Sequence, residues 1–254
     1  MGVDEKLQGI CLKERADRLL VDRGLVVSRE RAKALIMAGE VVAGDHKVDK
    51  PGQLIDTGLE LRIKDDIPFV SRGGLKLQKA LDFFAINVDS AVALDVGAST
   101  GGFTDCLLQR GARRVFAVDV GYGQLAWKLR QDTRVLCLEK TNIRYLEPQQ
   151  LPETPDIAVI DASFISLDKV LPNTVRLVRS KGTVVALIKP QFEVGKGEVG
   201  KGGVVRDPEK HSAVIDSVCA LAGSLNLQVV GVTESPLLGP KGNKEFLVCL
   251  KKLE

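Results

Sequence analysis

The stretch Ala93–Phe103, with the sequence ALDVGASTGGF, decides the fold of this chain. Its first residues are aliphatic apart from Asp95, which is typical of a strand buried on both faces of a sheet. A glycine-rich turn follows at once. In an open α/β sheet such a turn lies at the carboxyl end of the strand, where ligands bind and where glycine lets the backbone approach them closely. The stretch therefore predicts an α/β domain with a ligand site at residues 97–103.

The residues around this turn indicate what kind of ligand it binds. The turn lacks the dinucleotide pattern G-x-G-x-x-G, and Asp95 would repel a pyrophosphate but suits a cationic group such as an amino group. Asp119 ends the next predicted strand, where a carboxylate can accept hydrogen bonds from ribose hydroxyls. Ordinary turn carboxylates are the alternative. The residues predicted to bind a nucleoside cofactor are Asp95, Gly97, Ser99, Thr100, Gly101, Gly102, Phe103, Asp119 and Asn142.

Strands and helices alternate on both sides of this turn. The predicted strands cover residues 91–96, 114–118, 157–160, 183–188, 229–234 and 246–251, and the predicted helices cover 104–110, 167–178 and 211–224. Aliphatic strands that alternate with helices indicate a mostly parallel sheet with helices on both faces. The last two strands have no helix between them, so we expect them to pair antiparallel.

The N-terminal part of the chain follows a different pattern. Two short helices are predicted from residue 17 and over residues 29–38, with Gly24 ending the first and Ser28 capping the second. Short strands are predicted at residues 40–45 and 59–63. We therefore predict a small α+β domain at residues 1–64, a linker at 65–69 and the large domain at 70–254.

Composition excludes several classes of protein. The chain has 254 residues, 44% of them hydrophobic, and a net charge of +3, which is ordinary for a folded protein able to bury a core. The 5 cysteines form no C-x-x-C pair and the 2 histidines lie far apart, so we expect no metal site. We see no signal peptide and no membrane span, and we expect a cytoplasmic protein. The oligomeric state stays open.

Six motifs along the chain resemble those of the TlyA family, whose members are often labelled haemolysin A. They are SRGGLKL at 71–77, DVGASTGGFT at 95–104, VDVGYGQL at 118–125, DASFISL at 161–167, KPQFE at 189–193 and GNKEF at 242–246. The resemblance implies a Rossmann-like class I methyltransferase domain of the FtsJ type, S-adenosylmethionine as cofactor and 2′-O-methylation of ribosomal RNA. It also implies that residues 15–64 form an RNA-binding domain like that of ribosomal protein S-four. Gly44-Asp45 departs from the Asn-Gly or Asp-Gly turn usual there.

The resemblance further implies a catalytic set. The Lys-Asp-Lys-Glu set of FtsJ-type enzymes carries over to Lys76, Asp161, Lys189 and Glu245. A ribose hydroxyl becomes a good nucleophile only when it loses its proton, so a base is needed. We expect Lys189 to be that base, Asp161 and Lys76 to orient it, and Glu245 to organise the hydroxyl or Lys76. Ordinary surface salt bridges are the alternative.

Basic residues are expected to bind the RNA. Those predicted to contact it are Arg15, Arg18, Arg29, Arg31, Lys33, Arg72, Lys196 and Lys201. Carboxylates are nearly as numerous around the first five, so a solvated charged face is the alternative. Lys196 and Lys201 lie in a long loop rich in glycine and lysine, of a kind that is often functional. Two other functions stay open: an inactive ribosome-assembly factor and a membrane-lytic haemolysin.

Overall fold

The chain forms two compact units. The computed structural model describes residues 13–44, 46–63, 68–195, 197–200 and 202–254. The small unit comprises Met1–Pro68 and the large unit comprises Phe69–Glu254. Each unit has its own hydrophobic core.

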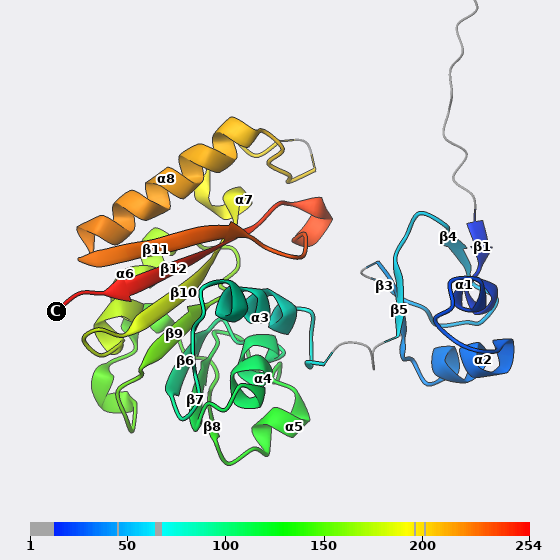
Figure 1. Cartoon of the computed structure of the whole chain (residues 1–254), viewed down its shortest axis with the longest axis horizontal. Helices are drawn as coiled ribbons and strands as arrows, with labels where there is room; N and C mark the ends of the chain where they lie inside the picture. Colours follow the sequence, from blue (N-terminus) through cyan, green and yellow to red (C-terminus); the bar gives the residue numbers. More distant parts are fainter. Residues whose placement is uncertain (1–12, 45, 64–67, 196, 201) are drawn as a thin grey trace, which may run out of the picture. The chain divides into compact units, whose positions relative to one another are not determined.

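The large unit is built on a seven-stranded sheet with the order β11-β12-β10-β9-β6-β7-β8 (Figure 1). Its strands are β6 (Val92–Val96), β7 (Arg114–Val118), β8 (Val135–Leu138), β9 (Ile157–Ile160), β10 (Thr183–Ile188), β11 (Leu227–Glu234) and β12 (Phe246–Lys252). Strands β6 to β10 pair in parallel, whereas β12 pairs antiparallel with both β10 and β11. The prediction of a mostly parallel sheet with an antiparallel last strand is therefore confirmed.

Helices cover both faces of this sheet (Figure 1). They are α3 (Gly73–Phe83), α4 (Gly102–Gln109), α5 (Trp127–Arg130), α6 (Leu167–Leu177), α7 (Pro190–Glu193) and α8 (Pro208–Ser224), with short 3-10 turns η2 (Ile143–Tyr145), η3 (Pro148–Gln150) and η4 (Pro240–Gly242). One core lies between the sheet and helices α6 and α8, and the other lies between the sheet and helices α3 and α4. Strand β6 contributes Val92, Leu94 and Val96 to the first core and Ala93 to the second. This alternation places Asp95 on the α4 face of the sheet.

Helix α3 and strand β8 are among the elements of the large unit that were not predicted. Helix α3 begins with Gly73 and Gly74, and glycine is a poor helix former, so propensity argues against a helix there. The helix forms because Leu77, Ala80 and Leu81 lie on one face and pack into the core beside α4. Strand β8 is the outer strand of the sheet, and all four of its residues are only half-buried.

The described part of the small unit contains two short helices and two small sheets. Its elements are β1 (Lys13–Arg15), α1 (Ala16–Asp22), α2 (Arg29–Met37), β2 (Val41–Ala43), β3 (His46–Lys47), β4 (Leu54–Asp56) and β5 (Leu61–Ile63). Strand β1 pairs with β4, and β2 lies between β3 and β5. The predicted N-cap is confirmed, because Ser28 Oγ accepts a hydrogen bond from the Arg31 amide at 3.2 Å. Gly24, just after α1, has a φ of +68°, as a helix-ending glycine requires.

Gly101 offers a test of how the glycine-rich turn at residues 97–103 is held. Its φ is +96°, and a Cβ there would lie 2.2 Å from Cδ1 of Leu129. A left-handed conformation costs a non-glycine residue roughly 1–2 kcal/mol. We expect Gly101→Ala to lower the free energy of unfolding by at least this amount. Chemical denaturation measures the change.

Gly223→Ala is the matched control. Gly223 lies in helix α8, and nothing lies within 4 Å of the Cβ it would gain. Alanine is the better helix former, so this variant should be more stable by about 0.5–1 kcal/mol. Equal stability of the two variants would contradict the role given to Gly101.

Candidate active site

The glycine turn after β6 touches the end of the neighbouring strand β9. Gly97 has a φ of +84°, and a Cβ there would lie 2.9 Å from the carbonyl oxygen of Asp161. On the other side of the turn, a Cβ at Gly102 would lie 2.3 Å from Oγ of Ser71. Only glycine permits both approaches. The turn is therefore held between the segment that precedes α3 and the segment that follows β9.

Asp119, at the carboxyl end of β7, forms hydrogen bonds with the glycine turn after β6 and with the turn after β7. Its Oδ2 accepts a hydrogen bond from the Ser99 amide at 2.8 Å, and its Oδ1 accepts one from the Gly121 amide at 2.7 Å. Ser99 and Thr100 are exposed, whereas Phe103 is buried in the core on the α4 side. Asp119 thus fixes the backbone of the glycine turn after β6 to the turn after β7.

Asn142 lies near the end of the neighbouring strand β8 and is half-buried. Its side chain caps η2 by accepting a hydrogen bond from the Arg144 amide at 3.1 Å. This contact leaves the amide group of the side chain with its two N–H donors for other partners.

Asp95 is completely buried beneath the turn. Its Oδ2 accepts a hydrogen bond from the Thr104 hydroxyl at 2.6 Å, while its Oδ1 is buried and has no hydrogen-bond partner among the described residues. Burial, reinforced by the nearby carboxylates of Asp161 and Asp119, raises the pKa of Asp95 to about 7. The site thus holds a carboxylate that a cationic ligand would stabilise in its charged form.

Lys189 and Asp161 form the first of two ion pairs at the carboxyl edge of the sheet. Lys189 follows β10, and its Nζ lies 2.6 Å from Asp161 Oδ1 and donates to Ser163 Oγ at 2.8 Å. Only 7% of the Lys189 side chain is exposed. These oxygens hold the amino group in one place beside the glycine-rich turn.

Lys76 and Glu245 form the second ion pair. Nζ of Lys76, on α3, donates to Oε2 of Glu245 at 2.5 Å, and the Glu245 side chain is fully buried. Ile188 pairs with Phe246 in the β10–β12 register, so Lys189 and Glu245 take the next opposite positions on these strands. The second oxygen of Glu245 is buried without a hydrogen-bond partner among the described residues. The four residues of the predicted catalytic set therefore form two lysine–carboxylate pairs on adjoining strand ends.

Three polar residues of the site were missed by sequence reasoning. Thr104 holds Asp95 and Ser163 holds Lys189, as described above. Asn243 is buried; its Oδ1 accepts from the Val205 amide at 3.1 Å, and its Nδ2 donates to the carbonyl oxygens of Gly203 and Pro240. It thereby joins the glycine-rich loop to the turn before Glu245. All three lie inside the motifs DVGASTGGFT, DASFISL and GNKEF, and their polar character was the available signal.

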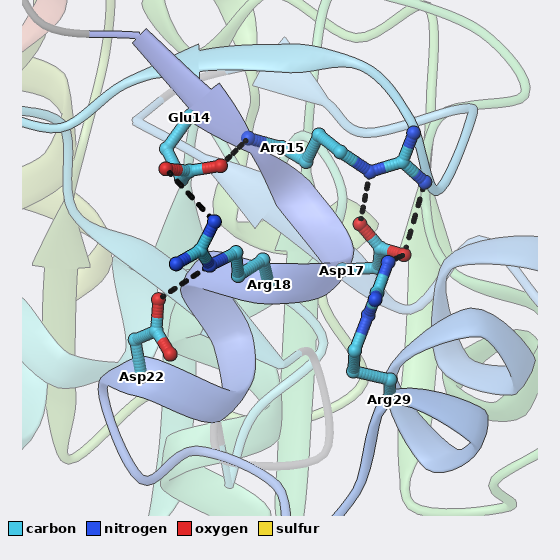
Figure 2. A network of polar contacts seen from close by, with 6 residues as sticks. All are labelled: Glu14, Arg15, Asp17, Arg18, Asp22 and Arg29. Carbon is cyan, nitrogen blue, oxygen red and sulfur yellow. Dashed lines mark hydrogen bonds and ion pairs between the residues drawn. The ribbon is translucent and has the colours of Figure 1, made fainter.

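The predicted RNA-binding residues are distributed over both units. In the small unit Arg15 and Arg29 contact Asp17, and Arg18 lies between Glu14 and Asp22 (Figure 2). Arg31 and Lys33 are exposed on α2. Arg72 is half-buried at the start of α3. Lys196 and Lys201 lie outside the described residues.

Comparison with known proteins identifies the family. Residues 69–252 match the model of the FtsJ-like methyltransferases, and residues 14–61 match the model of the S4 domain. The 16S/23S rRNA (cytidine-2′-O)-methyltransferase TlyA of Mycobacterium tuberculosis is 48% identical over 241 residues, which cover 94% of this chain and 90% of that protein. The chain belongs to the TlyA family.

Other relatives in the TlyA family carry a different label. Hemolysin A of Brachyspira hyodysenteriae is 39% identical over 234 residues, which cover 92% of this chain and 98% of that protein. A solved structure from Streptococcus thermophilus, described as a hemolysin, is 48% identical, has a TM-score of 0.76 and matches over 96% of this chain and 90% of that chain.

The fold of the large unit is shared more widely. An S-adenosylmethionine-dependent methyltransferase from Listeria monocytogenes, 15% identical with a TM-score of 0.53, shares the fold over 72% of this chain and 100% of that chain.

Two kinds of feature are absent from the described part of this TlyA-family chain. None of the described helices is both long enough and apolar enough to cross a membrane. The described His, Cys, Asp and Glu side chains form no group of three or more that could hold a metal ion.

The burial of Asp95 predicts a pH-dependent stability. Its pKa is raised from 3.8 to about 7, so between these values the folded protein holds a proton that the unfolded chain has released. Stability should therefore fall as the pH rises through this window, by about 4 kcal/mol at 1.36 kcal/mol per pKa unit. Asp95→Asn, which cannot ionise, should remove this loss. Denaturation of both proteins at pH 4.5 and pH 8 measures it.

The low pH serves as the internal control for this comparison. At pH 4.5 the two proteins should be similarly stable, because Asp95 is then mostly protonated and asparagine can still accept the hydrogen bond from Thr104. At pH 8 the variant should be the more stable protein. If Asp95→Asn changed the free energy of unfolding by the same amount at both pH values, the charge of Asp95 would not be the cause.

Proposed function

We propose that this protein transfers a methyl group from S-adenosylmethionine to a ribose 2′-hydroxyl of ribosomal RNA. The observation that carries the proposal is the paired arrangement of Lys189–Asp161 and Lys76–Glu245 beside a glycine-rich ligand turn. Membership in a family whose curated relatives include rRNA 2′-O-methyltransferases supports the same reaction. Ribosomal RNA as substrate places the work of the enzyme in the cytoplasm.

The residues around the glycine turn suit S-adenosylmethionine. The orphaned Oδ1 of Asp95 and its raised pKa call for a positive charge nearby, which this cofactor carries on its amino and sulfonium groups. Asp119 is available at the end of β7 for ribose hydroxyls, and Asn142 for polar groups of the base. When bound, the cofactor supplies an electrophilic methyl group.

Lys189 is proposed to act on the acceptor hydroxyl. A neutral Lys189 would take the hydroxyl proton on Nζ as the methyl group passes from the sulfonium sulfur, which would leave as a neutral thioether, to the hydroxyl oxygen. The resulting ammonium would rest between Asp161 and Ser163. Nζ lies 2.6 Å from Asp161 Oδ1 and 2.8 Å from Ser163 Oγ, so both partners are in place to hold that ammonium group. Lys76 and Glu245 complete the site at the same edge of the sheet, where Lys76 would add positive charge near the developing alkoxide.

An exposed aromatic ring beside Lys189 is proposed to hold the target base. Phe164 is 90% exposed, its φ of +62° is unusual for a residue with a side chain, and its ring lies 5.2 Å from that of Phe192. The Phe192 ring in turn lies 5.9 Å from Lys189 Nζ. Single-stranded RNA bases stack on such rings, so Phe164 can support the nucleotide whose hydroxyl reaches Lys189.

Substitution of Lys189 tests the proposed chemistry. Lys189→Ala should keep the fold and the cofactor affinity but lower the single-turnover methylation rate about 10²–10⁴-fold, as the loss of a general base does. Lys189→Arg separates two roles, because arginine stays protonated and cannot be a base. If Lys189 is the base, the arginine variant is as inactive as the alanine variant. Partial activity would mean that Lys189 acts only through its positive charge.

Lys181→Ala is the matched control for these variants. Lys181 precedes the same strand at its opposite end and is 68% exposed. Its loss should leave the methylation rate unchanged. Near-normal turnover of Lys189→Ala would remove Lys189 from the mechanism and leave Lys76 as the candidate base. A wild-type protein that methylates neither naked nor assembled ribosomal RNA would favour an inactive assembly factor.

The two units are proposed to divide the work, with residues 1–64 binding RNA, residues 65–69 linking and residues 70–254 catalysing. A chain restricted to residues 69–254 should bind S-adenosylmethionine as tightly as the full chain, which calorimetry measures. Its kcat/KM for RNA should be at least about tenfold lower than that of the full chain, because phosphate contacts supply most of the affinity for RNA. Circular dichroism controls for folding. Equal kcat/KM for both chains would show that the small unit is not an RNA anchor.

A further inference from the structure

The carboxylate of Glu245 lies against the turn that precedes it in the chain. Its Oε2 accepts from Lys76, but its Oε1 is buried and has no hydrogen-bond partner among the described residues. Oε1 faces the backbone of Gly239 instead, where a Cβ would lie only 2.0 Å from it. The Ser235 amide donates to the Glu245 carbonyl at 2.9 Å, which fixes the main chain of Glu245 but not its carboxylate. The carboxylate is therefore placed by the ion pair on one side and by the turn on the other.

This turn, residues 239–243, joins β11 to β12 and has a strained backbone (Figure 1). Lys241 has a φ of +59°, in the left-handed region that a residue with a side chain rarely adopts. The Gly239 amide donates to the Asn243 carbonyl at 2.8 Å, and the Gly242 amide donates to the Gly239 carbonyl at 3.1 Å. These bonds stay inside the turn. A strained backbone persists only where its surroundings hold it, so the turn needs an attachment to the rest of the large unit.

The side chain of Asn243 supplies this attachment. It is buried, and its Nδ2 donates to the Pro240 carbonyl at 2.9 Å, inside the turn. The same Nδ2 donates to the Gly203 carbonyl at 3.0 Å, and Oδ1 accepts from the Val205 amide at 3.1 Å. One amide group thus uses both of its donors and an acceptor to join the turn to the end of the glycine-rich loop.

The segment to which Asn243 is joined is itself fixed. Val204 and Val205 are buried, and the Val205 carbonyl lies 2.8 Å from Nε2 of His211, a buried residue of α8. The His211 ring also packs edge-on against the ring of Phe246, the first residue of β12, at 5.6 Å. Asn243 therefore connects a strained turn to an anchored part of the large unit.

We propose that Asn243 is the positioning residue that fixes the Lys76–Glu245 pair, because it holds the turn against the Glu245 carboxylate. Asn243 acts through Glu245, since its own side-chain hydrogen bonds go to main-chain atoms. The consequence for turnover rests on the proposed function, in which this ion pair serves methyl transfer. Without Asn243 the turn and the carboxylate would shift, and a misplacement of about 1 Å can slow a reaction by about 10²-fold.

Single-turnover methylation by the full-length chain tests this role. The assay uses saturating S-adenosylmethionine and saturating ribosomal RNA, naked or assembled, whichever the wild-type chain methylates. Asn243→Ala should lower the rate by about 10–100-fold, the scale of a small misplacement in an active site. Its affinity for S-adenosylmethionine, measured by calorimetry, should stay that of the wild type. A near-normal rate would overturn the proposal.

A double-mutant cycle with Glu245→Gln separates positioning from general damage to the fold. If Asn243 acts through Glu245, adding Asn243→Ala to Glu245→Gln should cost less than about threefold, because residues that act as one unit are not additive. General damage would multiply the two losses. Multiplied losses would therefore overturn the proposal.

Gly239→Ala keeps the test valid if Asn243→Ala fails to fold. Gly239 has a φ of −74°, which alanine adopts readily, so the new Cβ would act mainly on the flexible Glu245 carboxylate. This variant should also be slow, and its loss should also largely vanish in the Glu245→Gln background. A wild-type rate for folded Gly239→Ala would show that the turn does not place the carboxylate, which contradicts the proposal.

Asn173→Ala is the matched control. Asn173 lies on α6, is half-buried and also donates through Nδ2 to two main-chain carbonyls, those of Ile143 and Leu146. Its loss should lower the stability of the fold but leave the methylation rate near that of the wild type. If Asn173→Ala were as slow as Asn243→Ala, the effect would be one of instability and the proposal would be wrong.

The reactivity of Lys76 separates this inference from the proposed reaction, because it is measured without methyl transfer. The Lys76 side chain is 12% exposed and is held by Glu245. If the carboxylate moves, an acylating reagent should modify Lys76 several-fold faster in Asn243→Ala and Gly239→Ala but not in Asn173→Ala, as mass spectrometry of the labelled peptide shows. Unchanged labelling would overturn the positioning role. Faster labelling in a protein whose wild type transfers no methyl group would leave that role standing and make the proposed reaction wrong.

Discussion

The close approach of Gly97 to the carbonyl oxygen of Asp161 is the constraint on which the rest of the active site depends. Hydrogen bonds on both sides of it connect three strands: the Asp161 amide donates to the Val96 carbonyl and the Gly97 amide to the Val118 carbonyl. A side chain at position 97 would force β6 and β9 apart at their carboxyl ends. The glycine turn and the Asp161–Lys189 pair are therefore held together by backbone contacts, and the side chains proposed to act on the substrate need only short reaches.

The charged groups buried at this site lower the stability of the folded protein. Glu245 and Lys189 are almost completely buried, and Asp95 has no counter-charge within hydrogen-bond distance among the described residues. Desolvated charges of this kind rarely favour folding, even when they are paired. Such an arrangement is typical of catalytic sites, where groups are held ready for charge that develops during the reaction. The hydrophobic cores on both faces of the sheet provide the stability that this local cost requires.

Much of the fold could be predicted because its signals are local. The aliphatic runs at residues 114–118, 157–160 and 183–188 are strands in the structure with these same bounds, and the grouping of Lys76, Asp161, Lys189 and Glu245 follows from their motifs. Helix α3 was missed because its stability comes from packing against α4, which glycine propensity does not reveal. The sharing of Asp17 between Arg15 and Arg29 could not be read from the sequence either, because counting charges does not tell which of them pair.

The position of β12 has a consequence for how the protein is made. This strand lies between β10 and β11, yet it follows both of them in the chain. During synthesis β11 therefore has no place in the growing sheet until β12 has left the ribosome, and Glu245 arrives with that same strand. The place for β11 and the ion pair between Glu245 and Lys76 therefore both depend on the docking of this one strand against β10.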